Sequence, residues 1–146
     1  MTIKYSQGVY TVKNPDKYVG KGKPRWRSSW ELNFMLWCDN NKGVVKWASE
    51  PIRIPYRNPI TGKNTTYVPD FFIQYIDKDN KIHNEIIEIK PEKHQLMEKA
   101  GKSKYNQYQV VINQAKWNSA MIYCKKQGLI FRILNETQLF HNGKAK

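Results

Sequence analysis

Two apolar stretches near the middle of the chain, residues 67–72 and 85–90, flank the polar run 77–81. Both stretches are rich in β-branched and aromatic residues, and the run between them consists of turn formers. This combination is typical of a β-hairpin. If the turn is centred on Asp79, strand partners lie at equal distances along the chain on either side of it. The pattern therefore predicts one hairpin with a defined register.

That register brings two acidic residues together, because it pairs Asp70 with Glu88. Like charges directly opposite on a sheet repel, and a divalent cation would compensate them. Lys90 lies two residues beyond Glu88, so strand alternation brings it to the same face. Two carboxylates suit Mg²⁺, and a nearby lysine can orient or deprotonate the attacking water. These residues predict metal-dependent phosphodiester hydrolysis. The alternative is a surface hairpin whose Glu88 and Lys90 are solvated.

A helical pattern precedes the hairpin. Four apolar positions recur at helical spacing between residues 30 and 38 and predict an amphipathic helix ending near residues 40–41. Ser28 and Glu31 have the spacing of a capping box, in which Glu31 reaches back to the cap amide. This structural role is sufficient for Glu31. The functional alternative makes it a third carboxylate at the Asp70 and Glu88 metal site.

The rest of the pattern predicts two further strands and a long helix. Residues 43–47 lead to an alternating strand at residues 52–56, and Pro55 places this strand at a sheet edge or makes it a strand end. A helix begins at residue 105 and stops at Gly128. Residues 129–134 form a strand with a parallel neighbour, because it follows a long helix. The predicted inward positions of the long helix are Tyr108, Val111, Ile112, Ala115, Ser119 and Ile122.

Polar segments separate these elements. Residues 91–103 are basic and predict a mobile loop over the site. Its His94 is a candidate proton shuttle or, alternatively, an exposed residue with no role. Residues 135–138 predict a brief final turn, and residues 141–146 are expected to fray.

Charge favours a polyanionic partner. The 146 residues carry 25 Lys and Arg against 12 Asp and Glu, a formal net charge of +13 spread over the whole chain. Such a field attracts nucleic acid, although some basic proteins have no such role. One domain spanning residues 1–146 is predicted, with a basic, irregular arm over about residues 1–27. The arm either follows a phosphate backbone or packs through Tyr10 and Tyr18. The candidate DNA contacts are Lys21, Lys23, Arg25, Arg27, Lys93 and Lys116.

Other features exclude several classes of protein. Cys38 and Cys124 lie far apart without a CxxC partner, so neither a zinc site nor a disulfide framework is indicated. No apolar run approaches the ~20 residues of a membrane span, and the polar start is no signal peptide. We therefore expect a soluble, intracellular protein.

The order of these elements resembles that of the PD-(D/E)xK endonucleases. It is more narrowly similar to the head completion nucleases of T-even-type tailed bacteriophages and, distantly, to transposon end-cleaving nucleases. The similarity spans roughly residues 5–133 and ends in a second helix and a strand. The motifs that carry it are Arg27-Ser28-Ser29-Trp30-Glu31, Trp47-Ala48-Ser49-Glu50-Pro51-Ile52, Tyr67-Val68-Pro69-Asp70-Phe71 and Glu88-Ile89-Lys90.

The resemblance implies an α/β core with a central mixed sheet flanked by helices. It implies Glu31, Asp70 and Glu88 as metal-binding acids and Lys90 as the catalytic lysine. The implied cofactor is Mg²⁺, with Mn²⁺ as a substitute, and the implied substrate is DNA. The resemblance also implies that the protein acts late in virion assembly. It would act in the cytoplasm of the infected bacterial host or in association with the virion. Head vertex or neck proteins are then possible partners, and a membrane is not.

Two other function classes remain open. A non-enzymatic assembly protein could bind the DNA end or the head vertex through its charge alone. Such a surface has no reason to bring Asp70 and Glu88 together, because carboxylates repel phosphates. An RNA-binding protein is a further alternative, but the sequence lacks the aromatic RNP signature and a KH-type GxxG clamp.

Overall fold

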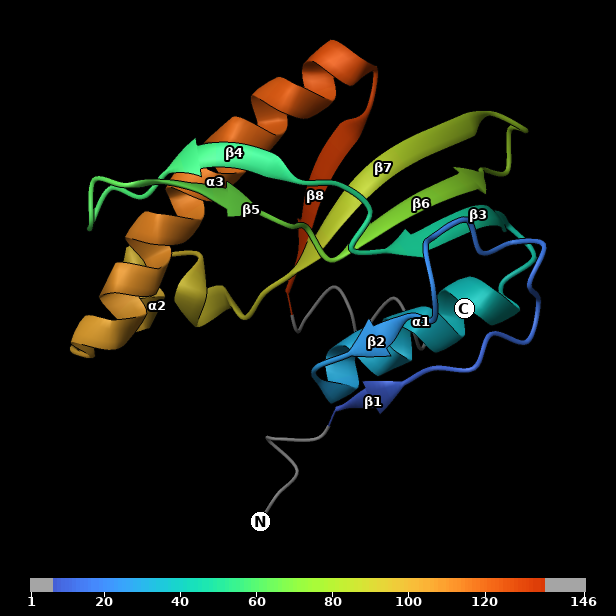
Figure 1. Ribbon diagram of the computed structural model, residues 1–146, viewed down its shortest axis with the longest axis horizontal. Helices are drawn as coiled ribbons and strands as arrows, with labels where there is room; N and C mark the ends of the chain where they lie inside the picture. The colour runs from blue at the N-terminus through green and yellow to red at the C-terminus, as the bar shows by residue number, and fades with distance from the viewer. Residues whose placement is uncertain (1–6, 136–146) are drawn as a thin grey trace.

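The computed structural model describes residues 7–135, which form a central sheet with helices on both faces (Figure 1). The sheet has four strands in the order β3-β6-β7-β8, and two smaller two-stranded sheets, β1-β2 and β4-β5, lie outside it. The predicted mixed sheet flanked by helices is confirmed. The elements are β1 (Gly8–Val9), β2 (Arg25–Trp26), α1 (Ser29–Asn40), β3 (Val44–Ser49), β4 (Ile54–Arg57), β5 (Asn64–Tyr67), β6 (Phe71–Ile76), β7 (Ile82–Ile89), the 3-10 helix η2 (Glu92–His94), α2 (Met97–Ala100), α3 (Lys104–Gln127) and β8 (Ile130–Leu134).

The central hairpin has the predicted register. β6 and β7 pair antiparallel from Phe71 opposite Ile87 to Ile76 opposite Ile82. Asp77 fixes the turn, because its Oδ1 accepts the backbone N–H of Asp79 and of Lys81, at 2.8 and 3.0 Å. β8 runs parallel to β7, as its place after a long helix predicted.

One boundary of the hairpin was predicted wrongly. Residue 67 does not belong to it, because Tyr67 ends β5, which pairs with β4 in a separate sheet. The chain between Tyr67 and Phe71 includes Pro69, which has no backbone N–H for a ladder. The hairpin therefore begins only after Asp70. Pro55 lies in the two-stranded β4-β5 sheet, consistent with the predicted edge position.

Helix α1 covers one face of the sheet. Its Phe34, Met35 and Cys38 are buried in one cluster with sheet residues that include Phe71 and Ile87. The predicted helix and its N-cap are confirmed, since the Ser28 Oγ accepts the N–H of Glu31 at 3.2 Å. Because alternate residues of a strand face opposite sides, the odd-numbered residues of β6 and β7 face α1.

Residues 7–27 pack against α1 and β3. The Tyr10 hydroxyl donates to the buried Asp39 at 2.6 Å, and the Tyr18 ring meets Trp47 edge-on with centroids 4.7 Å apart. The Lys17 ammonium donates to three carbonyls at the end of α1, those of Cys38, Asp39 and Asn41. Packing through Tyr10 and Tyr18 was one of the two interpretations of this segment. Its remaining basic side chains still face solvent.

Helix α3 covers the other face together with β4 and β5. The helix and its end at Gly128, where φ is 75°, are confirmed. The predicted inward face is wrong, because Tyr108 and Ile122 are 49% and 60% exposed. The true inward stripe follows strict three- and four-residue spacing and includes the polar Asn113, which a search for apolar residues alone passes over. Its residues are Val110, Asn113, Trp117, Ala120 and Cys124.

The segment after β7 is more ordered than predicted. In place of a loop over residues 91–103, it contains η2 and α2. The predicted turn at 135–138 and the fraying of 141–146 fall almost wholly on residues 136–146, outside the described part of the chain. No helix within residues 7–135 is long and apolar enough to cross a membrane.

Candidate active site

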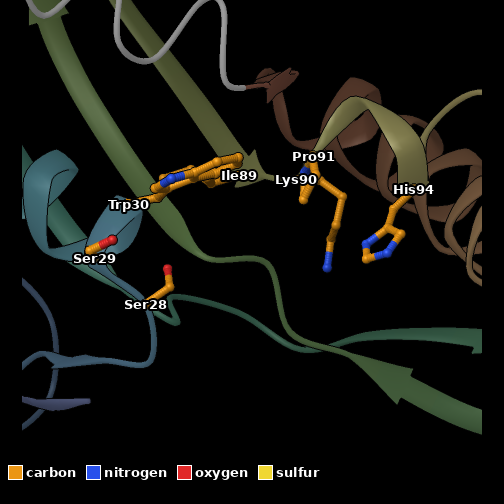
Figure 2. Close-up of a pocket in the computed structure, with 7 residues that line it drawn as sticks. All are labelled: Ser28, Ser29, Trp30, Ile89, Lys90, Pro91 and His94. Atoms are coloured by element: carbon orange, nitrogen blue, oxygen red, sulfur yellow. The ribbon is translucent and has the colours of Figure 1, made fainter. Parts of the chain in front are cut away.

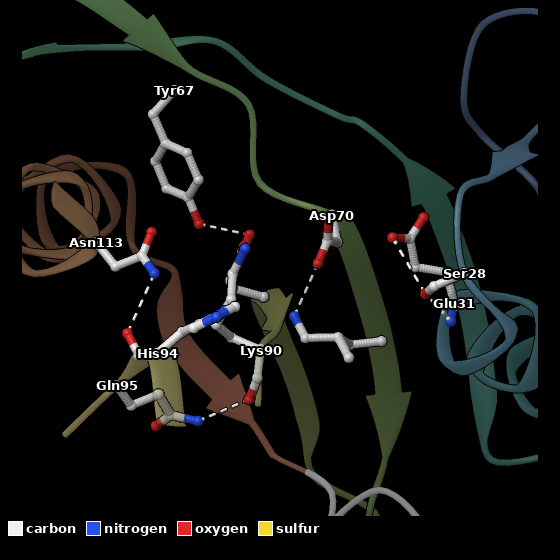
Figure 3. Close-up of polar contacts among 10 residues, drawn as sticks. Ser28, Glu31, Tyr67, Asp70, Lys90, His94, Gln95 and Asn113 are labelled. Atoms are coloured by element: carbon white, nitrogen blue, oxygen red, sulfur yellow. Dashed lines mark hydrogen bonds and ion pairs between the residues drawn. The ribbon is translucent and has the colours of Figure 1, made fainter. Parts of the chain in front are cut away.

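The ends of β6 and β7 bring three of the predicted residues together. Asp70 immediately precedes β6, Glu88 lies near the end of β7, and Lys90 follows it. The Asp70 Oδ2 accepts the backbone N–H of Ile89 at 2.8 Å, which fixes its carboxylate beside β7 (Figure 3). Since Ile87 and Ile89 belong to the cluster under α1, the intervening Glu88 points to the opposite face.

Glu88 is only 5% exposed and is held from two sides. Its Oε1 accepts the Tyr67 hydroxyl at 2.6 Å, and its Oε2 lies 3.5 Å from the Lys90 Nζ. The Lys90 backbone is fixed as well, because its N–H donates to Leu134 and its carbonyl accepts the Gln95 side chain. Rigid elements therefore hold both members of this ion pair.

The two acids lie in an environment that disfavours two negative charges. Burial, followed by the charges of Glu88 and Glu31, raises the pKa of Asp70 well above its usual value. Burial also raises the pKa of Glu88, although Lys90 and the Tyr67 hydroxyl act in the opposite direction. The nearby ammonium of Lys90 does not offset the effect of burial on either acid. Such shifted acids in one place are typical of functional sites.

Glu31 lies near this pair, but its carboxylate is engaged at the start of its own helix. Its Oε1 accepts the backbone N–H of Arg27 at 3.1 Å, and the Ser28 hydroxyl lies 3.5 Å from its Oε2. The predicted capping contact is thus displaced by one residue, from the Ser28 amide to that of Arg27. Burial raises the pKa of Glu31 while this backbone hydrogen bond lowers it.

The carboxylates do not form a ready-made metal cage. Among residues 7–135, no group of three or more His, Cys, Asp or Glu side chains is arranged to hold a metal ion. Asp70 and Glu88 are the central pair, and the charge of Glu31 reaches Asp70 from the α1 side. A divalent ion would therefore meet two acids first, with Glu31 free to join only by leaving its helix cap.

Helix α3 contributes a second lysine to the site. Lys116 lies over the rings of Tyr56 and Tyr67, with its Nζ 5.9 and 5.6 Å from the centroids. Burial and the charge of Lys90 lower the pKa of Lys116, whereas Glu88 and Asp70 raise it. Among the predicted DNA contacts within residues 7–135, only Lys116 has an electrostatic interaction with both Asp70 and Glu88.

The other predicted DNA contacts lie at the surface. Lys21, Lys23, Arg25 and Lys93 are exposed. Arg27 is also exposed but forms an ion pair with Glu50.

A cavity opens directly beside Lys90. It measures about 380 Å³ and lies between the start of α1, at Ser28 and Trp30, and His94 of η2 (Figure 2). The His94 ring contacts Asn106, with Nε2 3.1 Å from Oδ1, and burial lowers its pKa. His94 is therefore partly buried and lines the cavity beside Lys90, and its role as a proton shuttle stays a prediction.

Tyr67 is the site residue that sequence reasoning missed. The motif before Asp70 includes it, but nothing in the local pattern links its hydroxyl to a carboxylate 21 residues away. The link requires β5 to pair with β4 outside the central sheet and to end beside the last residues of β7. Burial and the Glu88 charge raise the pKa of Tyr67, so this hydroxyl remains a hydrogen-bond donor.

Two comparisons with known proteins bear on this site. The profile of the family described as TnsA-like endonuclease N terminal matches residues 41–136, a span that includes Asp70, Glu88 and Lys90. The chain is also 35% identical over 142 residues to the head completion nuclease of Enterobacteria phage T4. That alignment covers 90% of this chain and 92% of the phage protein.

Proposed function

This chain belongs to the TnsA-like endonuclease family, whose nuclease domain is PD-(D/E)xK-like, and we propose that it is a Mg²⁺-dependent DNA endonuclease. The observation that carries the proposal is the pair of inward-facing acids Asp70 and Glu88, with the Lys90 Nζ 3.5 Å from Glu88. A protein selected only for stability gains nothing from this repulsion. A phosphodiester hydrolase needs such a site for its metal and its water.

The residues present fit a hard divalent cation. Asp70 and Glu88 offer carboxylate oxygens, which Mg²⁺ prefers, and an ion between them would remove the repulsion that raises the pKa of Asp70. Glu31 is the proposed third acid, reached by exchanging its cap contact for the ion. When bound, Mg²⁺ supplies polarisation of the phosphodiester and stabilisation of the leaving oxygen. Mn²⁺ has the same ligand preferences and is expected to substitute.

The side chains around the acids have separate roles in this proposal. Lys90 donates a hydrogen bond to the attacking water or stabilises the developing negative charge, because it is the ammonium beside Glu88. Tyr67 holds the Glu88 carboxylate in one orientation through its 2.6 Å hydrogen bond. Lys116 is too constrained over two aromatic rings to reach far, so we assign it a contact to a phosphate close to the cut.

Affinity for DNA comes from charge spread over the surface. We expect the exposed Lys21, Lys23, Arg25, Arg27 and Lys93 to contact the phosphate backbone, which carries little sequence information. Binding should then show little sequence preference and fall steeply with salt, because each neutralised phosphate releases counterions. A salt-insensitive or strongly sequence-selective affinity would contradict this part of the proposal.

The biological setting follows from the relative's name alone. We propose that the chain acts in phage head completion after DNA packaging, in the cytoplasm of the infected host. Its partners would then include DNA and proteins of the head vertex or neck, and it could remain associated with the virion. A DNA-end-binding role without catalysis remains the alternative, and the same experiment separates the two.

The test is a cleavage assay on linear, branched and supercoiled DNA with Mg²⁺, Mn²⁺, Ca²⁺ or EDTA. We expect cleavage with Mg²⁺ or Mn²⁺ and none with EDTA. An Asp70→Asn preparation purified in parallel controls for contaminating nucleases. Binding without cleavage of any substrate under all metal conditions would favour the non-enzymatic alternative and overturn the endonuclease.

A further inference from the structure

The start of α3 carries two exposed aromatic side chains that the proposed chemistry does not use. Tyr105 is 66% exposed and Tyr108 is 49% exposed. Residues three apart on a helix lie on the same side, so the two rings are neighbours. We call this pair the tyrosine platform. Exposed aromatic pairs without a core role are typical of binding surfaces.

The chain leading to the tyrosine platform is positively charged. Between residues 90 and 104 the sequence has five lysines against two glutamates. Lys99 forms a 3.7 Å ion pair with Glu92, while Lys93, Lys102 and Lys104 are exposed. This excess of positive charge complements a phosphate backbone, which makes nucleic acid the matching partner.

The tyrosine platform is continuous with the candidate active site. Tyr105 meets the His94 ring edge-on, with centroids 6.2 Å apart and an interplanar angle of 79°. His94 in turn lines the cavity that Lys90 shares (Figure 2). A DNA strand that leaves the site past Lys90 would therefore pass His94 before reaching Tyr105.

Hydrogen bonds hold this end of α3 in place. The Ser103 Oγ caps the helix by accepting the Asn106 N–H at 3.2 Å, and the Gln107 side chain donates to the Gly101 carbonyl at 2.8 Å. The Asn113 side chain donates to the His94 carbonyl at 3.2 Å, as Figure 3 shows. The rings thus project from a fixed helix start, so little order has to be gained on binding.

We propose that the tyrosine platform stacks unpaired bases of a single strand adjoining the cut site. Bases inside a duplex already stack on one another and cannot offer their faces to an external ring, whereas unpaired bases can. The preferred substrate is then DNA with a single-stranded segment beside the scissile bond, such as an overhanging end or a fork. This inference rests on the proposed nuclease function and specifies its substrate class.

The test measures binding of the full-length protein in EDTA, so that no cleavage occurs. The probes are a fluorescein-labelled oligo-dT and a fluorescein-labelled, blunt-ended linear duplex at one salt concentration. Since stacking contributes about 1–3 kcal/mol per base, the double variant Tyr105→Ala/Tyr108→Ala should bind oligo-dT roughly 10- to 100-fold more weakly. Its affinity for the duplex should change less than about twofold, because its charges are intact.

Two matched variants make the result decisive. Tyr105→Phe/Tyr108→Phe keeps the stacking faces and should bind oligo-dT like wild type. Met121→Ala/Ile122→Ala trims exposed side chains at the other end of α3 and should also bind like wild type. Unchanged oligo-dT binding by the alanine variant, an equal loss on both probes, or failure of the phenylalanine variant would each overturn the platform.

The two proposals fail differently in these experiments. If Mg²⁺-dependent cleavage of duplex DNA persists while the affinity for oligo-dT is unchanged by the tyrosine substitutions, the tyrosine platform proposal is wrong and the nuclease proposal is unaffected. If wild type cleaves no DNA with any metal, the nuclease proposal is wrong whatever the tyrosines bind.

Discussion

Two buried acidic centres of this molecule contrast sharply. Asp39, at the end of α1, is 1% exposed and accepts hydrogen bonds from Tyr10, Lys13 and Asn14. Burial alone would raise the pKa of Asp39, but these hydrogen bonds outweigh it and lower the pKa. At Asp70, burial and the charges of Glu88 and Glu31 raise the pKa, and at Glu88 burial raises the pKa against the opposing effect of Lys90 and Tyr67.

The difference shows what each carboxylate is for. The protein itself satisfies Asp39, so that its charge joins residues 7–27 to α1. The protein leaves the charge of Asp70 and Glu88 partly uncompensated, which is the arrangement that the proposed metal site would use. A buried acid with a lowered pKa is thus structural here, and a facing pair with raised pKa values is the functional candidate.

The largest expected effect separates catalysis from stability at the pair. We expect Asp70→Asn and Glu88→Gln each to reduce Mg²⁺-dependent cleavage by about three orders of magnitude or more, because each removes an anionic ligand at constant size. The melting temperature should stay the same or rise, since each change relieves repulsion. Cleavage assays and thermal melting of the purified variants check both halves. Full activity in either variant would refute the site.

Lys90 should have the next largest effect, confined to the rate. Lys90→Ala is expected to lower the single-turnover rate by roughly two to four orders of magnitude, the scale of acid–base and electrostatic contributions. DNA affinity should hardly change, because Lys90 is one of 25 basic residues. Single-turnover kinetics at saturating protein separate rate from binding. A loss of affinity with the saturated rate preserved would make Lys90 a phosphate contact instead.

Glu31 tests whether a capping carboxylate also serves the site. Glu31→Gln can keep the hydrogen bond from the Arg27 amide, so the melting temperature should move little. If Glu31 is a ligand, cleavage should fall by about two orders of magnitude or more. Parallel melting and cleavage measurements decide the matter. Retained activity would return Glu31 to a purely structural role.

Asp39 should show the smallest catalytic effect and a clear stability effect. Asp39→Asn replaces a charged acceptor of several hydrogen bonds and is expected to lower the free energy of unfolding by about 1–3 kcal/mol. Cleavage by the folded variant should stay near wild type, because Asp39 lies outside the acid pair. Denaturant unfolding monitored by tryptophan fluorescence measures the loss. A variant as stable as wild type would remove the contrast between the two centres.

The pH dependence of stability sharpens the same contrast. Because its folded-state pKa is lowered, Asp39 stabilises the fold fully above its unfolded pKa, about 3.9, and loses this contribution as pH falls through its folded pKa. Asp70 has a raised pKa, so its ionisation costs stability as pH rises through that higher value. The free energy of unfolding should be measured at several pH values. Asp39→Asn should reduce its dependence on pH in the acid range, and Asp70→Asn should reduce its dependence on pH at the higher values where Asp70 ionises.

Much of the fold could be predicted because its signals are local. Turn formers around Asp79 set the hairpin register, Ser28 starts α1, and Gly128 stops α3. The prediction failed where a contact with another element decided the outcome. The inward face of α3 includes Asn113 because its amide donates to His94, a partner 19 residues earlier in the chain. Periodicity of apolar residues cannot detect such a polar member of a buried stripe.

The sequence by itself determined the short-range facts about the site: that Asp70 and Glu88 meet across a hairpin, and that Lys90 follows on the same face. Alternation along a strand and the position of a turn are sufficient for both. Only the tertiary structure decided that Tyr67 donates to Glu88 and Tyr10 to Asp39, contacts that join residues 21 and 29 apart. Such pairs form because separate elements pack over one sheet, and the pairing of two particular side chains across elements leaves no periodic trace in the chain.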